Sequence, residues 1–363
     1  MGNIYQATCT VIPLHMQRHI ADYGDDDDRE RVKVTRHLTS CISRGREQTL
    51  ISAVSKSVDP QKRRYVYDAR NGHTLPGKLV MSERKEATKD VEAREAFEGA
   101  GATYDFFDKI FSRKSIDGRG MRLVSTIHYE RNFNNAMWDG QQMVFGDGDG
   151  KLFNRFTEPK DIIGHEFAHG VTQLTAALEY HDQTGALNEH FSDVMGMMIK
   201  QMWLAQTVMQ SDWQIGRGLF TSMVNGEALR SMKAPGTAYD DPVLGREPQP
   251  AHMRGYVFTA DDNGGVHINS GILNHAFFLT ATRLGGHSWD VAGWLWYVVL
   301  EERLSPKATF QDFANATVLL AGQKFGFGGH VQTTVADAWA EVGLQVPLSL
   351  IKGGAGISTL AVY

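Results

Sequence analysis

The stretch that decides the fold runs from Asp161 to Asp193. It begins Asp161-Ile-Ile-Gly-His-Glu-Phe-Ala-His-Gly and ends Gly-Ala-Leu-Asn-Glu-His-Phe-Ser-Asp193. His165 and His169 are four residues apart, so on a helix they project from one face with about 40° between them. Both imidazoles can therefore reach one cation, and Glu166 lies beside it.

A second pair of acidic side chains has the same spacing. Glu189 and Asp193 put two carboxylates on one face of a second helix. Two helices folded back on each other would supply His, His and Glu and leave a fourth position open, as in a catalytic zinc site, whereas a structural site is closed by four protein ligands. The alternative is a buried helix whose histidines are satisfied by neighbouring side chains, and the spaced carboxylates disfavour it.

The predicted ligand set indicates hydrolytic chemistry. Zinc on His165, His169 and Glu189 would lower the pKa of its bound water towards about 7. Glu166, next to that water, can accept its proton and later deliver it to a leaving amine, which is the general-base role of this motif.

Other residues could support the zinc and the reacting groups. Asp193 and Asn188 have the spacing to orient a ligand histidine, and helix capping or interior hydrogen bonding is the alternative.

Hydrolysis of an amide also needs donors aimed at the developing oxyanion. Tyr180 and His267 are candidates, and Asp262 could pair with His267 and keep it protonated. For both donors a purely structural role is the alternative.

Composition excludes several classes of partner. The chain has 363 residues, 42% of them apolar, and a formal charge of -5 with no basic stripe, which disfavours nucleic acid and a membrane surface. No run approaches 18 apolar residues, so we expect no membrane span. The N-terminus lacks the features of a secretory signal. We therefore expect a protein made in the cytoplasm, with later non-classical export left open. We also expect a monomer.

The chain changes character near Gly150. Before it we expect α+β structure: a hairpin from Arg64 to Ser82 around the turn Asn71-Gly72, a helix over 91–111, and strands over 123–129 and 142–145. After it we expect helices over 159–178, 187–205, 267–284, 288–303, 309–324 and 332–342, an irregular cleft wall over 226–262, and a loose tail from Val346.

Six motifs, taken in order, resemble those of the thermolysin-like (M4-type) zinc metallopeptidases. The similarity covers about Arg64 to Leu344. The motifs are Asn134-Asn135-Ala136-Met137-Trp138, Gly146-Asp147-Gly148-Asp149-Gly150, His165-Glu166-Phe167-Ala168-His169, Gly185-Ala186-Leu187-Asn188-Glu189 with Asp193, Ala228-Leu229-Arg230-Ser231-Met232, and Asp262 through Gly271.

The resemblance implies an α+β fold of two lobes, with a β-rich N-terminal lobe, a helical C-terminal lobe and the zinc helix between them. It implies an endopeptidase with zinc on His165, His169 and Glu189, Glu166 as base, and Tyr180 and His267 as transition-state donors with Asp262 behind His267. It also implies that Asn135, the Ala136 backbone and Arg230 grip the substrate main chain. An apolar pocket favouring a large apolar P1′ residue would be lined by Phe153, Phe156, Ile162, Ile215 and Leu229, which by composition alone would be core residues.

One departure from the family concerns calcium. The better-known members hold a calcium pair on carboxylates near the second zinc helix. Here Asp161 and Asp212 match that site, but Lys200, Gln214 and Arg217 stand where further acidic ligands would be. We therefore expect the double calcium site to be lost, with Lys200 or Arg217 neutralising the remaining carboxylates.

The other departure is a short charged N-terminal segment. Residues 1–50 resemble the pro-segment of the protealysin-like branch, and we expect them to cover the cleft in a precursor and to be cut off. The remaining expected boundaries are 51–182 for the N-terminal lobe, 183–345 for the helical lobe and 346–363 for the tail. Cys9 could cap zinc in the precursor. The alternative for the segment is a docking helix over about Val32 to Ile42 with a solvated acidic loop at Asp25 to Asp28.

Two other functions compete with an endopeptidase. A non-catalytic zinc-stabilised binding module on a peptidase fold would need none of Glu166, Tyr180, Asp262 and His267, so their presence argues against it. An aminopeptidase or dipeptidase would require a group that anchors the substrate amine, and the sequence offers no candidate.

Overall fold

The N-terminal lobe is built on a mixed sheet. The computed structural model describes residues 10–49, 61–85 and 88–352. The five strands are ordered β2-β1-β3-β5-β4, with β1 parallel to β3, β3 parallel to β5, and the two outer pairs antiparallel. Their bounds are β1 Arg64–Asp68, β2 Lys78–Ser82, β3 Leu123–Ile127, β4 Ala136–Trp138 and β5 Met143–Phe145. The predicted hairpin is confirmed, and β4 forms the edge of the sheet.

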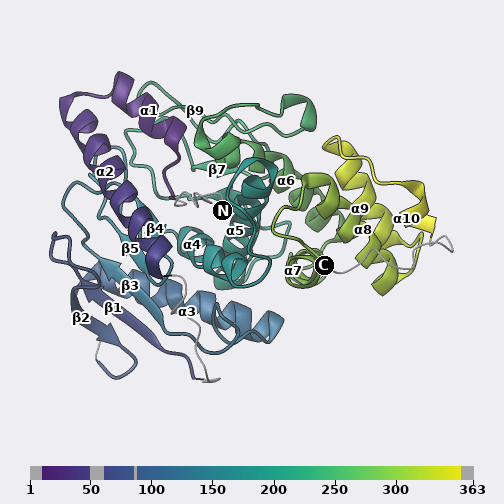
Figure 1. Cartoon of the computed structure of the whole chain (residues 1–363), viewed down its shortest axis with the longest axis horizontal. Coiled ribbons are helices and arrows are strands. Elements are labelled where there is room, and N and C mark those ends of the chain that lie inside the picture. The colour runs from purple at the N-terminus through teal and green to yellow at the C-terminus, as the bar shows by residue number, and fades with distance from the viewer. Residues whose placement is uncertain (1–9, 50–60, 86–87, 353–363) are drawn as a thin grey trace.

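A long helix covers this sheet. Helix α3 (Val91–Phe111) begins at Asp90, whose side chain accepts a hydrogen bond from the Ala93 amide and satisfies one of the unpaired donors of the first turn. Its buried face of Ala93, Ala96, Phe106 and Phe107 belongs to the main core. The helix therefore ties the sheet to the centre of the molecule, as Figure 1 shows.

Two helices cross the centre of the molecule. Helix α4 (Lys160–Gln173) and helix α5 (Asp182–Trp203) are buried along most of their lengths and pack extensively on each other. Gly196 allows the close approach: a Cβ there would lie 2.4 Å from the Asp161 carbonyl oxygen. The first helix ends earlier than expected and the second begins earlier, so the side chains of the decisive stretch come from two tightly packed helices.

The remaining helices form the C-terminal lobe. They are α6 (Asp262–Leu284), α7 (Ala292–Glu302), α8 (Phe310–Phe325), α9 (His330–Glu341) and α10 (Leu348–Lys352). Short strand pairs precede them, β6 Gln214–Ile215 with β7 Arg230–Ser231 and β8 Asp240–Asp241 with β9 Gly245–Arg246, followed by the 3₁₀ turn η1 Met253–Gly255. The expectation of a loose tail was wrong for α10, because Leu350 is buried and its carbonyl accepts from Gln332.

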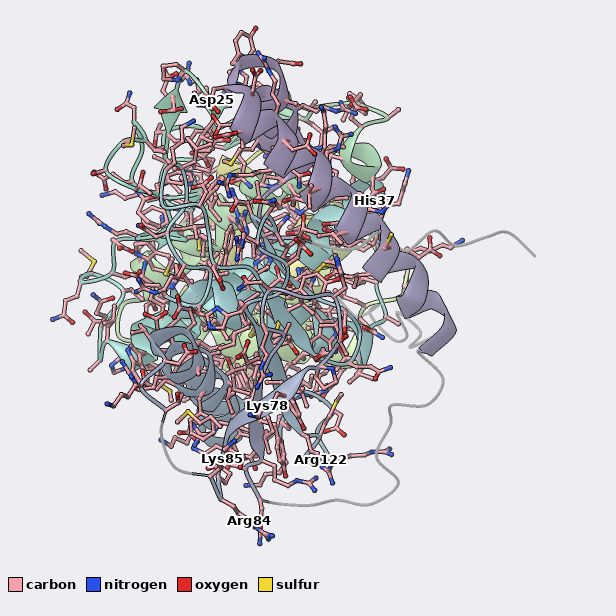
Figure 2. All side chains as sticks on the ribbon, turned by 90° about the vertical axis from the view of Figure 1, so that its left-hand side faces the viewer. Asp25, His37, Lys78, Arg84, Lys85 and Arg122 are labelled. Atoms are coloured by element: carbon pink, nitrogen blue, oxygen red, sulfur yellow. The ribbon has the colours of Figure 1, made fainter. Side chains whose placement is uncertain are left out.

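The N-terminal segment lies across the body as two helices, α1 (Leu14–Tyr23) and α2 (Asp26–Thr49). Figure 2 shows α2 running along the surface, with Asp25 near its start and His37 further along. The alternative of a solvated acidic loop holds only in part: Asp25 to Asp27 are exposed, but Asp26 to Asp28 form the first turn of α2, where negative charge is favoured. Asp28 is buried and caps the turn with Asp25.

Within the described residues, none of the helices combines the length and the apolar character that crossing a membrane requires.

Candidate metal centre and substrate cleft

The predicted zinc ligands converge on one buried point. The Nε2 atoms of His165 and His169 are 3.0 Å apart, and they lie 3.5 and 3.6 Å from the Glu189 carboxylate oxygens. Ligand atoms about 2.1 Å from a tetrahedral zinc ion lie about 3.4 Å from one another. The three side chains are at most 3% exposed. Their spacing therefore fits a zinc ion.

The hydrogen bonds behind the histidines fix which nitrogen faces the ion. His165 Nδ1 lies 2.8 Å from Asp193 Oδ1, and His169 Nδ1 lies 2.8 Å from Asn188 Oδ1. The Asp193 carboxylate and the Asn188 amide oxygen can only accept, so each Nδ1 serves as donor and each Nε2 keeps its lone pair, directed towards the other. Two lone pairs this close repel each other, and a metal ion or a proton between them relieves that repulsion. Ser192, whose Oγ is 3.0 Å from His169 Nδ1, was missed from the sequence.

Asp193 is itself held by a cation. The Nε and Nη2 atoms of Arg230 each donate to it at 2.8 Å. Burial alone would raise the pKa of Asp193, but Arg230 and then His165 outweigh burial and hold that pKa well below its usual range. Arg230 was expected to grip substrate, and the structure sets its guanidinium against Asp193; its contact with substrate stays a prediction.

Glu166 is fully buried beside the ligand set. Its Oε2 accepts from the backbone amide of Trp138 at 2.9 Å, while Oε1 has no hydrogen-bond partner among the described residues. Burial raises the pKa of Glu166 to about 7, although the nearby His165 opposes the rise. A carboxylate with this pKa can both accept and return a proton near neutral pH.

The two predicted donors, Tyr180 and His267, meet at the Glu189 carboxylate. The Tyr180 hydroxyl donates to Glu189 and lies 3.3 Å from His267 Nε2. Asp262 Oδ1 is 2.6 Å from His267 Nδ1. Burial lowers the pKa of His267, but Asp262 and Glu189 more than compensate and raise it to about 9. A pKa raised in this way favours the charged form of His267, which can donate from both ring nitrogens.

A glycine turn delivers His267 to this position. Asp262, Asn263, Gly264 and Gly265 all have positive φ, and a Cβ at Gly264 would lie 2.1 Å from Asp182 Oδ1. Glycine is the residue that adopts this backbone at little cost. The sequence signal Asn263-Gly264-Gly265 thus has a direct structural cause.

The N-terminal segment lies against the expected substrate-binding backbone. The Val11 amide donates to the Ala136 carbonyl at 3.1 Å, and the Ile12 amide donates to Asn135 Oδ1 at 2.9 Å. Ala136 begins the edge strand β4, and Asn135 directly precedes it. Cys9 and its suggested contact with zinc fall outside the described residues.

The five expected pocket residues are buried, and several of them meet. Phe153 and Phe156 have ring centroids 5.8 Å apart, and side-chain atoms of Leu229 and Ile162 lie 2.9 and 3.3 Å from a Cβ built at Gly216. Ile215 pairs with Arg230 across β6 and β7. Their role in specificity stays a prediction.

Cationic side chains neutralise the carboxylates of the expected calcium position. Lys200 Nζ lies 2.9 Å from Asp212 and 3.7 Å from the buried Asp161, and Arg217 lies 3.5 Å from Asp212. Lys200 also donates to the Gln214 carbonyl at 2.8 Å. This ion-pair expectation is confirmed for both Lys200 and Arg217.

Comparisons with known proteins point to one family of similar sequences and structures. Residues 48–173 match the family model described as thermolysin metallopeptidase, catalytic domain, and residues 176–344 match its alpha-helical domain. An extracellular metalloprotease of Pectobacterium carotovorum is 46% identical over 93% of this chain and 97% of its own length, and Protease PrtS of Photorhabdus is 40% identical over 93% and 92%. The solved precursor of protealysin, a metalloproteinase from Serratia proteamaculans, is 46% identical with a TM-score of 0.85 over 93% of this chain and 99% of that one.

Proposed function

The chain belongs to the thermolysin family of zinc-dependent metalloendopeptidases, and we propose that it cleaves before large apolar residues and is held inactive by its own N-terminal segment. The observation that carries this proposal is the convergence of His165, His169 and Glu189 with Glu166 beside them.

The chain's own residues account for each need of peptide hydrolysis. Zinc, when bound to the ligand set, makes a water molecule acidic enough to act as a nucleophile at neutral pH. Glu166, with one buried oxygen bonded to the Trp138 amide, holds and transfers the proton. Tyr180 and His267 supply donors for the developing oxyanion, and Asp262 holds His267 in position.

The apolar residues Phe153, Phe156, Ile162, Ile215 and Leu229 support the P1′ preference, because burying a large apolar side chain is favourable by about 1.5–3 kcal/mol. We expect peptides that differ only at P1′ to be cleaved at least about 10-fold faster with Leu or Phe than with Ala or Asp. The measurement is kcat/KM for each peptide. Equal rates across the panel would contradict the preference.

The contacts of Val11 and Ile12 support inhibition by the N-terminal segment. Their amides donate to the Ala136 carbonyl and the Asn135 side chain, which are the groups expected to bind a substrate main chain. The Ile12 carbonyl accepts from Gln17 at 2.6 Å, and Pro13 then starts helix α1. The segment thus combines substrate-like contacts with a backbone that turns away into a helix.

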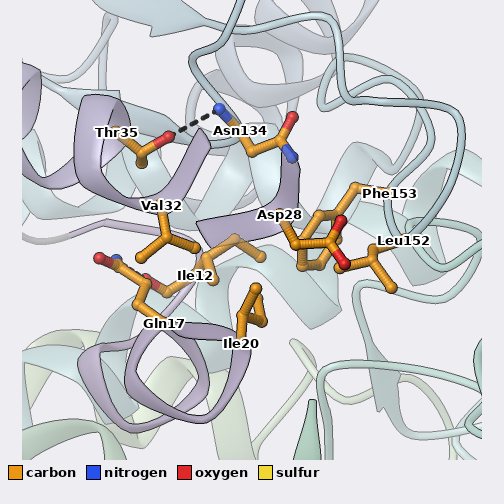
Figure 3. A pocket seen from close by; sticks show the side chains of 9 residues that line it. All are labelled: Ile12, Gln17, Ile20, Asp28, Val32, Thr35, Asn134, Leu152 and Phe153. Atoms are coloured by element: carbon orange, nitrogen blue, oxygen red, sulfur yellow. Dashed lines mark hydrogen bonds between the residues drawn. The ribbon is translucent and has the colours of Figure 1, made fainter. Parts of the chain in front are cut away.

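Further contacts hold the segment in place. Lys151 donates to Asp25 and Asp28 at 2.7 and 2.6 Å, and Thr35 accepts from the Asn134 amide at 3.0 Å. Figure 3 shows a cavity at this junction, lined by side chains of both the segment and the body. The lining residues are Ile12, Gln17, Ile20, Asp28, Val32, Thr35, Asn134, Leu152 and Phe153.

Incubating the 40.4 kDa chain with zinc is expected to remove about 5–6 kDa, at about 110 Da for each of some 50 residues. Mass spectrometry measures the loss, and cleavage of a casein-like substrate should rise with it. A Glu166→Ala chain, incubated in the same way, should stay intact if the cut is autocatalytic. No shortening together with full activity of the intact chain would contradict the proposal.

The ion pairs of Lys200 support the loss of the double calcium site. A calcium-selective chelator should leave the thermal unfolding midpoint unchanged, since no stabilising ion would be removed.

Lys200→Met should lower the free energy of unfolding by about 3 kcal/mol, because it leaves the buried Asp161 without its cation. Lys307→Met, at a side chain 78% exposed, is the matched control. A marked fall of the midpoint with the chelator would contradict the loss of the site.

A further inference from the structure

A chain of buried hydrogen bonds leads from helix α7 to the carboxylate behind the zinc ligand His165. The indole Nε1 of Trp296 donates to His190 Nε2 at 2.8 Å. His190 Nδ1 lies 2.8 Å from Asn274 Oδ1, and Asn274 Nδ2 donates to Asp193 Oδ2 at 2.8 Å. Trp296, His190 and Asn274 are fully buried. Figure 1 shows the helices α5, α6 and α7 that carry them near one another at the centre.

The two ends of this chain determine the direction of every bond in it. An indole N–H can only donate, so His190 Nε2 must accept and Nδ1 must carry the hydrogen. Asn274 must then accept with Oδ1 and present its NH₂ group to Asp193. An ionised carboxylate can only accept a hydrogen bond, so Asp193 must face the NH₂ group of Asn274. This is the same orientation of Asn274 that Trp296 and His190 require. One neutral tautomer of His190 and one orientation of Asn274 satisfy both ends.

This chain completes the bonding of Asp193. Oδ1 is contacted by His165 Nδ1 and Arg230 Nη2, and Oδ2 by Arg230 Nε and Asn274 Nδ2, all at 2.8 Å. A carboxylate has about four acceptor sites. All four acceptor sites of Asp193 are used, so rotation of its carboxylate would break several hydrogen bonds at once. The fixed carboxylate in turn holds the His165 ring in place.

We propose that Trp296, His190 and Asn274 act as positioning residues, which orient Asp193 and thereby hold His165 in the geometry that binds zinc. The proposal rests on the proposed zinc-dependent function and extends it to three residues that contact neither ion nor substrate. Trp296 fixes the His190 tautomer, His190 fixes the Asn274 amide, and Asn274 fixes the carboxylate.

The zinc affinity of the full-length chain tests this positioning role. The affinity is measured by competition with a chromophoric chelator. Every chain in the comparison also carries Glu166→Gln, which prevents self-cleavage. Asn274→Ala should weaken zinc binding about 10-fold, near the lower end of the effect of groups that orient a ligand. Trp296→Phe should weaken it about 3-fold, because His190 is then free to change tautomer.

Trp339→Phe is the matched control. Trp339 is fully buried, stacks on Trp296 with ring centroids 5.6 Å apart, and donates its own indole hydrogen bond to Thr317 at 2.8 Å. Trp339→Phe should lower the unfolding midpoint about as much as Trp296→Phe does, and it should leave the zinc affinity unchanged. Equal zinc affinity for the two tryptophan variants, or an unchanged affinity for Asn274→Ala, would overturn the positioning role and leave the proposed function intact.

Nitrogen-15 NMR of the histidine rings provides a measurement that does not depend on the variants of Asn274 and Trp296. The His190 signals are assigned by their absence in His190→Phe. In the zinc-loaded Glu166→Gln background chain they should show hydrogen on Nδ1 and none on Nε2. Hydrogen on Nε2 would overturn the proposal. A background chain that binds no zinc would overturn the proposed function together with the positioning role.

Discussion

Glu166→Ala is expected to reduce peptide cleavage about 10²–10⁴-fold, the usual contribution of a general acid–base group. Glu166 is fully buried, one carboxylate oxygen accepts from the Trp138 amide, and the side chain lies beside His165 and His169. Alanine removes the only carboxylate that the proposal assigns to proton transfer while leaving the three ligands in place. The measurement is kcat/KM on a peptide with Leu at P1′, using chains from which the N-terminal segment has been removed.

Zinc content separates this result from simple loss of the metal. The Glu166→Ala chain should still bind one zinc ion. Glu98→Ala, at a side chain 52% exposed on helix α3, should change neither cleavage nor zinc. Full cleavage by Glu166→Ala would contradict the assignment of the base. Absence of cleavage in the unmodified, trimmed chain would favour a non-catalytic zinc-binding protein instead.

His267→Ala is expected to lower kcat about 10²–10³-fold, the usual cost of losing one oxyanion donor. His267 Nε2 faces Tyr180 and Glu189 at 3.3 and 3.5 Å, and Nδ1 is held by Asp262 at 2.6 Å. A donor that acts on developing charge contributes mainly in the transition state, so KM should change little. Steady-state kinetics on the same peptide separates kcat from KM.

His287→Ala is the matched histidine control. His287 also lies beside an aspartate, Asp290, at 3.3 Å, but its side chain is 44% exposed and it belongs to none of the motifs of the site. It should leave kcat and KM unchanged. An effect of His267→Ala on KM alone would contradict the role in transition-state stabilisation and indicate a role in substrate binding.

Much of the metal centre could be predicted because its signals are local. The i, i+4 spacing of His165 and His169, and of Glu189 and Asp193, follows from the helical period, and each pair lies on one helix. The turn before His267 was also visible, since Gly264 and Gly265 have positive φ. Local backbone geometry is encoded in neighbouring residues and can be inferred from them.

Other features depended on contacts between distant segments. Asp28 was expected in a solvated loop, yet it is buried because α2 docks near Lys151, more than a hundred residues away in the chain. Asn274 and Trp296 carry no local signal for a role near zinc. Their hydrogen bonds to Asp193 and His190 form only when three helices pack together.

The sequence by itself predicted the candidate zinc ligands, the candidate base beside them and the two-lobed fold, because helical periodicity, glycine turns and the family motifs are properties of short stretches. Only the tertiary structure decided that Ser192 and Asn274 join the groups behind the ligand histidines, and how Val11 and Ile12 meet the edge strand. These contacts join residues far apart in the chain. Their geometry is set by the packing of whole helices, and no local pattern encodes it.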